Sequence, residues 1–279
     1  MWILKSSKDF LEYIQSRSLS SCNSIKIFDL STLYTTIPHS NLKNKLRELV
    51  QLCFIKKNDI FNRLQFLIDN IFVMFGGRVF QQSVGIPMGT NCAHLLADLL
   101  LYSYEVDFIQ GLLKRNEKKL ALSFNFTFRY IDDVLSLNNS RLDDFVHWVY
   151  PIELEMKDTS YLDLQFEIDD EGRLGRKHYD KRDDLNFPIV NFPFVCGNIP
   201  AAHAYGVYLS QMIRYSRACG SYQDFLERGL LLTMKLLNQG FLLVMLKSSL
   251  RKFYGCHHDL VDRYGISVSQ MTTDMFHLW

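Results

Sequence analysis

The sequence has almost no excess charge of either sign. Its 31 Lys and Arg side chains are balanced by 30 Asp and Glu, which leaves a formal net charge of +1. Nucleic-acid-binding domains commonly display a basic patch, and strongly acidic or basic proteins attract partners of the opposite charge. The overall charge therefore neither favours nor excludes nucleic acid, and any basic surface has to be local.

Cysteine is scarce and scattered. The chain has six Cys in 279 residues, and no two of them are spaced as C-x-x-C. This pattern is typical of reduced intracellular thiols and not of a disulfide framework or a zinc site. The run CHHD at 256–259 contains metal-binding residue types, but zinc ligands normally sit several residues apart, so we expect no metal there.

Long apolar runs, leaders and linkers are missing as well. The N-terminus lacks the basic region and continuous apolar run of a secretory signal. The most apolar long stretch, residues 229–246, is interrupted by Lys235, Asn238 and Gln239 before it reaches the ~20 residues that a membrane helix needs. We expect it to be a helix packed in a core. With 48% hydrophobic residues, the chain can bury a substantial core.

Hydrophobic periodicity predicts the order of the elements. A strand is expected within 24–34, a helix at 40–54, a hairpin at 72–82 around Gly76-Gly77, and a long helix at 92–115. Residues 124–139 alternate and predict a second hairpin, and further strands are expected at 152–157, 161–168 and 173–180. The pattern after Pro200 is helical. We therefore predict an α+β fold, with an antiparallel sheet and helices in residues 1–199 and a helical region in residues 200–279.

One pair of adjacent carboxylates, Asp132-Asp133, lies between apolar strands. Two unpaired carboxylates in such surroundings need a cation or a proton. Two-metal sites meet that need with carboxylates from separate strands, and Asp29, at the end of the alternating run IKIF, is the candidate third ligand. Alternatively, Asp29 starts a turn or caps the next segment of the chain. Three other pairs stand in hydrophilic company and are typical of surface or turn residues: Asp143-Asp144, Asp169-Asp170 and Asp183-Asp184.

Three segments in order resemble the A, B and C motifs of reverse transcriptases. They are FDLSTLYTTIP (28–38), GIPMGTNCAHLLADLLL (85–101) and YIDD (130–133). The residues of these motifs are most similar to those of the reverse transcriptases of Penelope-like retroelements, and the resemblance runs over residues 24–264. It implies a right-hand polymerase palm followed by a helical thumb. It also implies RNA-directed DNA polymerase activity on an RNA template and a DNA primer with deoxynucleoside triphosphates, and no membrane.

The resemblance assigns catalytic and metal-binding roles to Asp29, Asp132 and Asp133. Asp29 and Asp132 would hold two Mg²⁺ ions, for which Mn²⁺ is a substitute, and Asp133 would support them. Tyr34 matches the aromatic position that lies under the incoming sugar and obstructs a 2′-hydroxyl, which favours deoxynucleotides. The alternative for Tyr34 is an ordinary core aromatic.

The resemblance also implies contacts to nucleotide and nucleic acid. Gly85 and Gly89 would let the backbone approach the template base pair and the nucleotide, although an ordinary loop explains them equally well. The thumb-like region would contact phosphates through a group of basic side chains, each of which is alternatively a solvated helix charge. These candidates are Arg214, Arg217, Lys247, Arg251 and Lys252.

The sequence departs from the family in several places. Only 28 residues precede Asp29, so we expect the fingers and their basic triphosphate-binding side chains to be reduced. His94 stands where the family commonly has Pro, and Lys157 and Lys181 are both candidates for the residue that protonates pyrophosphate.

The departures favour a second hypothesis, a truncated or domesticated copy that keeps the fold or nucleic-acid binding without polymerising. A generic helical interaction module would leave the enclosed Asp pair unexplained. Kinship to retroelements suggests action in the nucleus, and oligomeric state stays open.

Overall fold

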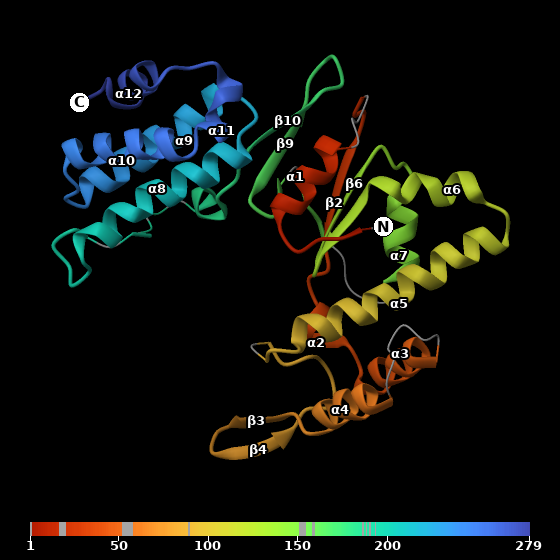
Figure 1. Cartoon of the computed structure of the whole chain (residues 1–279). Coiled ribbons are helices and arrows are strands. Elements are labelled where there is room, and N and C mark those ends of the chain that lie inside the picture. Colours follow the sequence, from red (N-terminus) through yellow and green to blue (C-terminus); the bar gives the residue numbers. More distant parts are fainter. Residues whose placement is uncertain are drawn as a thin grey trace. The chain divides into compact units, whose positions relative to one another are not determined.

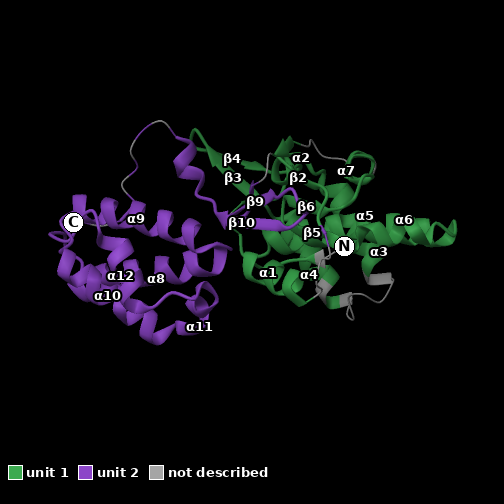
Figure 2. Cartoon of the chain, turned by 90° about the horizontal axis from the view of Figure 1, so that it is seen from above, with its two compact units in different colours: residues 1–18, 22–158 green, residues 19–21, 159–279 purple. Residues whose placement is uncertain are grey.

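The chain forms two compact units. The computed structural model describes residues 2–16, 21–51, 58–88, 90–150, 155–157, 160–185, 187, 189, 191–192 and 194–279. Unit 1 comprises residues 1–18 and 22–158, and unit 2 comprises residues 19–21 and 159–279 (Figure 2). The sequence pattern predicted a boundary at 199/200, whereas the units meet at 158/159. Residues 159–199 therefore group with the C-terminal helices.

Unit 1 is built on a five-stranded sheet in the order β1-β5-β6-β2-β7. Figure 1 labels two of its strands, β2 and β6. β1 runs parallel to β5, and the other neighbouring strands are antiparallel. Consecutive residues of β5 and β6 are buried, because successive residues point to opposite faces of a sheet and both faces are covered here. The strands are β1 (Trp2–Ile3), β2 (Ile25–Asp29), β5 (Thr127–Tyr130), β6 (Asp133–Leu137) and β7 (Glu155–Lys157).

Helices cover both faces of this sheet. On one face, Phe128 packs edge-to-face against Phe10 and Tyr13 of α1 (Ser7–Ser16), with ring centroids 5.0 and 5.1 Å apart. On the other face, Phe28 and Val134 belong to a core shared with α5 (Ala93–Lys114) and α7 (Leu142–Val149). Further helices of unit 1 are α2 (Leu33–Thr36), α3 (His39–Gln51), α4 (Asn58–Asp69) and α6 (Lys118–Ser123).

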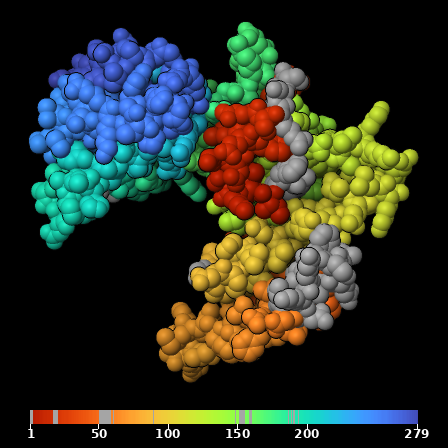
Figure 3. Space-filling model, in the orientation of Figure 1, coloured from red at the N-terminus to blue at the C-terminus, as the bar shows by residue number. Residues whose placement is uncertain are grey.

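The predicted hairpin around Gly76-Gly77 is confirmed as β3 (Phe72–Phe75) and β4 (Arg78–Gln81). Both glycines have positive φ, +59° and +74°, as a tight turn of this kind requires. Every side chain of the two strands is exposed, up to 82% for Phe75, and Figure 3 shows the hairpin (orange) projecting from the rest of unit 1. This hairpin thus leaves both of its faces without a covering layer.

Unit 2 combines a small antiparallel sheet with a helical bundle. The sheet has the order β10-β9-β8, and the Gly220 N–H donates to the Arg176 carbonyl at 2.7 Å where α8 and α9 adjoin β10. The helices enclose a core that includes Tyr208, Phe225 and Leu250. The strands are β8 (Ser160–Tyr161), β9 (Leu164–Ile168) and β10 (Leu174–His178), and the helices are α8 (Ala201–Ala218), α9 (Tyr222–Asn238), α10 (Leu243–Cys256), α11 (His258–Val261) and α12 (Val268–Phe276).

The predicted α+β class with antiparallel sheets is confirmed, with three local differences. The strand expected within 24–34 ends at Asp29, and α2 follows it. Phe124–Phe126 form a 3₁₀ turn and not the start of a strand. The apolar segment 229–246 is divided between α9 and α10 by a turn with Gly240 at φ +85°. Over the described residues, no helix combines the length and apolarity of a membrane span.

Candidate active site

Asp29 and the adjacent pair Asp132-Asp133, which is distant from Asp29 in the sequence, meet at one end of the unit 1 sheet. Asp29 is the last residue of β2 and is paired across the sheet with Asp133, the first residue of β6. Asp132 lies in the turn between β5 and β6, and its carbonyl accepts a hydrogen bond from the Leu30 N–H at 2.9 Å. The register of β2 on β6 therefore brings the three predicted catalytic residues together.

The turn that carries Asp132 is tight and strained. Tyr130 pairs with Asp133, so only Ile131 and Asp132 connect the strands, and Ile131 has φ +52°. A β-branched residue is disfavoured in this left-handed region because its side chain crowds the backbone. The Arg129 guanidinium donates to the Ile131 carbonyl at 3.1 Å and helps to hold the turn in place.

A lysine that the sequence left ambiguous lies among these acids. Lys157 of β7 pairs with Ile27, two residues before Asp29 on the same face of β2. Its Nζ donates to Asp133 Oδ1 at 2.5 Å and is 3.6 Å from Asp29 Oδ1. Burial opposes its charge, but Asp133 and Asp29 outweigh burial and raise the pKa of Lys157. The other candidate, Lys181, is an exposed residue of unit 2.

The carboxylate of Asp132 is electrostatically coupled to its neighbours. Burial raises the pKa of Asp132, and the charges of Asp133 and Asp29 raise it further, whereas Lys157 and the backbone N–H of Asp132 lower it. The ionised form of Asp132 is therefore less stable in this site than that of an isolated aspartate in water. A cation close to Asp132 would relieve this penalty.

Tyr34 lies on α2 within the field of the acids. Burial raises the pKa of Tyr34, and the charges of Asp132 and Asp98 add to the effect. The ring is half-buried and packs against the unit 1 core. This position is compatible with a core aromatic and with the predicted contact to a sugar, so the latter stays a prediction.

Gly85 lies so close to the backbone of Tyr34 that no larger residue fits at this position. It has φ +87°, and its N–H donates to the Ile37 carbonyl at 2.7 Å. A Cβ at this position would lie 2.6 Å from the Tyr34 carbonyl oxygen, which accepts a hydrogen bond from the Ile86 N–H. The contact of Gly85 with a template or nucleotide stays a prediction, and Gly89 lies outside the described residues. His94 is exposed on the first turn of α5.

The acids offer the oxygen ligands that Mg²⁺ prefers. The donor set therefore fits the predicted ion by its chemistry. Over the part of the chain that the structure describes, however, no group of three His, Cys, Asp or Glu side chains is arranged to hold a metal ion. The ammonium of Lys157 takes the place of the cation beside Asp29 and Asp133.

A buried ion network behind the site was not predicted from the sequence. Arg129 is fully buried, and its Nε lies 2.5 Å from Glu105 Oε1 and its Nη1 2.6 Å from Asp98 Oδ1. Tyr150 also donates to Glu105 Oε1, at 2.8 Å. Asp98 and Glu105 interrupt an apolar helix seven residues apart and so lie on the same side of it, which is the signal that could have revealed the network.

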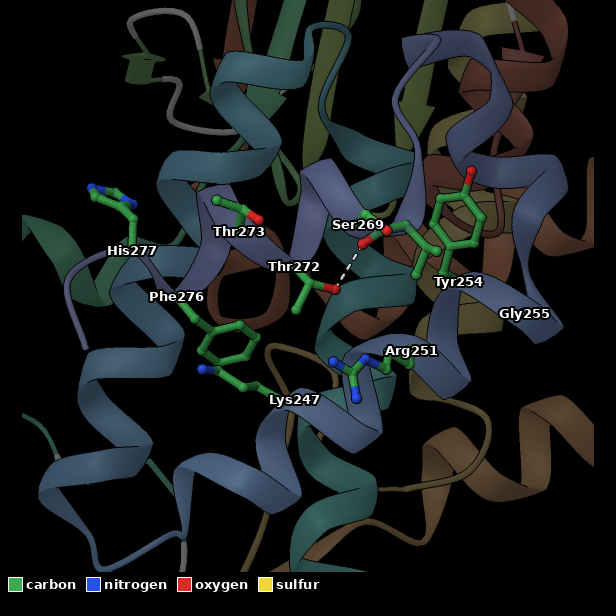
Figure 4. Close-up of a pocket in the computed structure, with 10 residues that line it drawn as sticks. Lys247, Arg251, Tyr254, Gly255, Ser269, Thr272, Thr273, Phe276 and His277 are labelled. Carbon is green, nitrogen blue, oxygen red and sulfur yellow. Dashed lines mark hydrogen bonds between the residues drawn. The ribbon is translucent and has the colours of Figure 1, made fainter.

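The basic candidates of unit 2 fall into separate environments. Arg214 is engaged by Asp163, with Nε and Oδ2 3.1 Å apart, while Arg217 is exposed on the last turn of α8. Lys247 and Arg251 line a pocket between α10 and α12 (Figure 4). Lys252 is exposed on α10 outside that pocket. The structure thus distinguishes members of a group that the sequence could only treat as a whole.

Comparison with known proteins gives little further information. The chain matches no protein-family model and no curated protein. It is similar to a telomerase from Candida albicans solved in complex with a TWJ fragment of telomeric RNA, with 15% identity and a TM-score of 0.46. The match covers 99% of this chain and 50% of the telomerase chain, so this chain spans half the length of that protein.

Proposed function

We propose that this chain is the RNA-directed DNA polymerase domain of a Penelope-like retroelement. One observation carries the proposal: Asp29 and the Asp132-Asp133 pair, which the motif resemblance singled out, lie together at one end of the unit 1 sheet. Structural Asp pairs on a surface have no need of such convergence. In this proposal the first unit contains the palm, and the helices of unit 2 form the thumb.

Each residue then has a defined task. Asp29 and Asp132 hold two Mg²⁺ ions, or Mn²⁺ in their place, with Asp133 in support. Such ions, when bound, activate the primer hydroxyl and stabilise the charge of the leaving group. Tyr34 restricts the sugar to the deoxy form. Lys157, whose raised pKa keeps Nζ protonated, delivers a proton to the departing pyrophosphate.

Primer extension on an RNA template tests this function. The full chain is supplied with a DNA primer, deoxynucleoside triphosphates and Mg²⁺ or Mn²⁺. We expect Asp132→Asn to lower the rate by about 1,000-fold or more, because metal ions contribute several kcal/mol to the stabilisation of the transition state. Asp170→Asn is the matched control, since Asp170 also belongs to an Asp pair but is exposed in the turn between β9 and β10.

The position of Lys157 favours a second candidate, a chain that binds nucleic acid without polymerising. A tethered ammonium beside Asp29 and Asp133 supplies the positive charge that a catalytic metal would otherwise bring. If the unmutated chain binds an RNA–DNA duplex but incorporates no nucleotide with either metal ion, the polymerase proposal is wrong and this second candidate takes its place.

A further inference from the structure

A pocket of about 710 Å³ lies between two helices of unit 2, away from the three carboxylates in the sequence and in a different unit. α10 contributes Lys247 and Arg251 to its wall, and α12 contributes Ser269, Thr272 and Thr273. In Figure 4 the Arg251 guanidinium lies on the side of the pocket where the Ser269 and Thr272 side chains stand, and the Lys247 ammonium lies beside the Phe276 ring. The volume is in the range of pockets that take small ligands or part of a larger one.

The two cations of this pocket, Lys247 and Arg251, have no acidic partner among the residues that the structure describes. Lys247 and Arg251 are four residues apart and thus neighbours on one helix face, where like charges destabilise the helix. Neither forms a salt bridge within the described residues. α10 contains no acid, and Asp274, the acid of α12, is engaged by Tyr222 at 2.8 Å and Gln270 at 2.6 Å. Lys247 instead rests over the Phe276 ring, 5.5 Å from its centroid.

Hydroxyl groups on the facing helix complete the lining. Thr272 Oγ1 donates to the Val268 carbonyl at 2.7 Å, so its proton is used within the helix. Ser269 and Thr273 have exposed side chains and make no hydrogen bond within the part of the chain that is described. Their O–H groups are therefore available as donors on the α12 wall of the pocket.

We propose that this pocket binds phosphate groups. A guanidinium presents a planar set of donors that matches phosphate oxygens, an ammonium adds a point charge, and Ser or Thr hydroxyls are common donors to phosphate. The phosphate can belong to the backbone of a bound polynucleotide or to a free nucleotide. The first source rests on the proposed function, in which RNA and DNA are substrates; the phosphate site itself does not, because it involves none of the three carboxylates.

Binding measurements on the full chain test the proposal. Fluorescence anisotropy with a labelled single-stranded RNA and with a fluorescent nucleoside triphosphate distinguishes the two sources, and inorganic phosphate serves as competitor. We expect Arg251→Gln to weaken binding of at least one probe by about tenfold. If the probe is RNA, the slope of log affinity against log salt should fall by about one. These measurements do not depend on polymerase activity. A failure of the phosphate-site proposal can therefore be distinguished from a failure of the proposed function.

Lys119→Gln is the matched control. It removes one positive charge from an exposed position of α6, in unit 1 and outside the pocket, and should change affinity by about twofold at most. Ser269→Asp places a carboxylate in the pocket, in the first turn of α12 where an acid is tolerated, and should weaken binding at least as much as Arg251→Gln without unfolding the protein. An equal loss for Lys119→Gln and Arg251→Gln, unchanged affinity in Ser269→Asp, or no binding of either probe would overturn the proposal.

Discussion

The acidic end of the unit 1 sheet and the basic pocket of unit 2 differ in whether their charged side chains have counter-ions. In unit 1, Asp29 and Asp133 already have the Lys157 ammonium between them, and the charges of Arg129 are matched by Asp98 and Glu105. In unit 2, the cations that line the α10–α12 pocket form no ion pair with a carboxylate within the described residues. An ion that binds to an already paired side chain must compete with the existing counter-ion. An ion that binds to an unpaired side chain meets no such competition.

The contrast also separates structural charges from those that act on a ligand. Arg129 is fully buried and satisfied by carboxylates, which is how a protein keeps a charge in its core. Arg251 is exposed and unpaired within the described residues, so its removal should leave the fold intact. We expect substitutions of buried charges to have the largest effects on stability and substitutions at exposed charges to act mainly on ion binding.

The largest effect is expected from Arg129→Met. The substitution keeps most of the side-chain volume but leaves the buried carboxylate of Glu105 without its counter-ion, which should lower the free energy of unfolding by about 3–5 kcal/mol. Urea unfolding measures this loss. Arg141→Met is the control, because its ion pair with Asp144 is about half exposed and should contribute less than about 1 kcal/mol. Similar losses in the two variants would show that burial does not govern these pairs.

Unit 2 should lose stability in acid through a buried histidine. Burial lowers the pKa of His178 from 6.5 to about 4, and Arg214 and Arg228 add to the effect. Neither ring nitrogen has a hydrogen-bond partner within the described residues. The unfolded chain therefore binds a proton that the folded chain resists, so this contribution is complete above about pH 6.5 and is lost as the pH falls through about 4.

The loss can reach about 3 kcal/mol, since a tenfold difference in proton affinity corresponds to about 1.4 kcal/mol. Urea unfolding between pH 7 and about pH 4 checks it. His178→Phe keeps an aromatic ring beside Tyr215 and should flatten the pH dependence, whereas His203→Phe, at an exposed position on α8, should leave it unchanged. An equally steep curve in His178→Phe would mean that other groups cause the acid sensitivity.

A smaller effect is expected from Lys157→Met, which removes the cation from the acidic end of unit 1. Its partly exposed ion pairs should contribute about 1 kcal/mol to stability. If the acids bind metal, Mn²⁺ should bind about tenfold tighter to the variant, because the ion no longer competes with the ammonium. Calorimetric titration measures this affinity. Weaker Mn²⁺ binding in Lys157→Met would show that the ammonium supports the ion and does not oppose it.

The sequence was sufficient for the parts that depend on local pattern. Alternation placed β5 and β6 and put Asp132 in their turn, and Gly76-Gly77 marked a hairpin. Alternation failed at Phe124–Phe126, which form a 3₁₀ turn because Phe124 packs onto Phe108 and Phe145 of the neighbouring helices. Such tertiary contacts override a local strand preference.

The ion pairs could not be predicted, because they depend on which strands and helices become neighbours. Lys157 reaches Asp29 only through the pairing of β7 with β2, and nothing near Lys157 in the sequence specifies that register. Arg214 pairs with Asp163 across unit 2 for a similar reason. The motif resemblance identified the acids as a set, whereas the counter-ions that control their charge emerged from the fold.

The left-handed turn residue Ile131 has a consequence for how this protein could change. A β-branched residue at φ +52° stores about 1–3 kcal/mol of strain, and Asn or Gly would adopt the same backbone with less. Selection for stability alone would therefore replace this isoleucine. A chain that keeps it keeps the packing of the Ile131 side chain against the unit 1 core next to Asp132, so mutagenesis that screens only for heat resistance should recover Asn or Gly at this position and lose that packing.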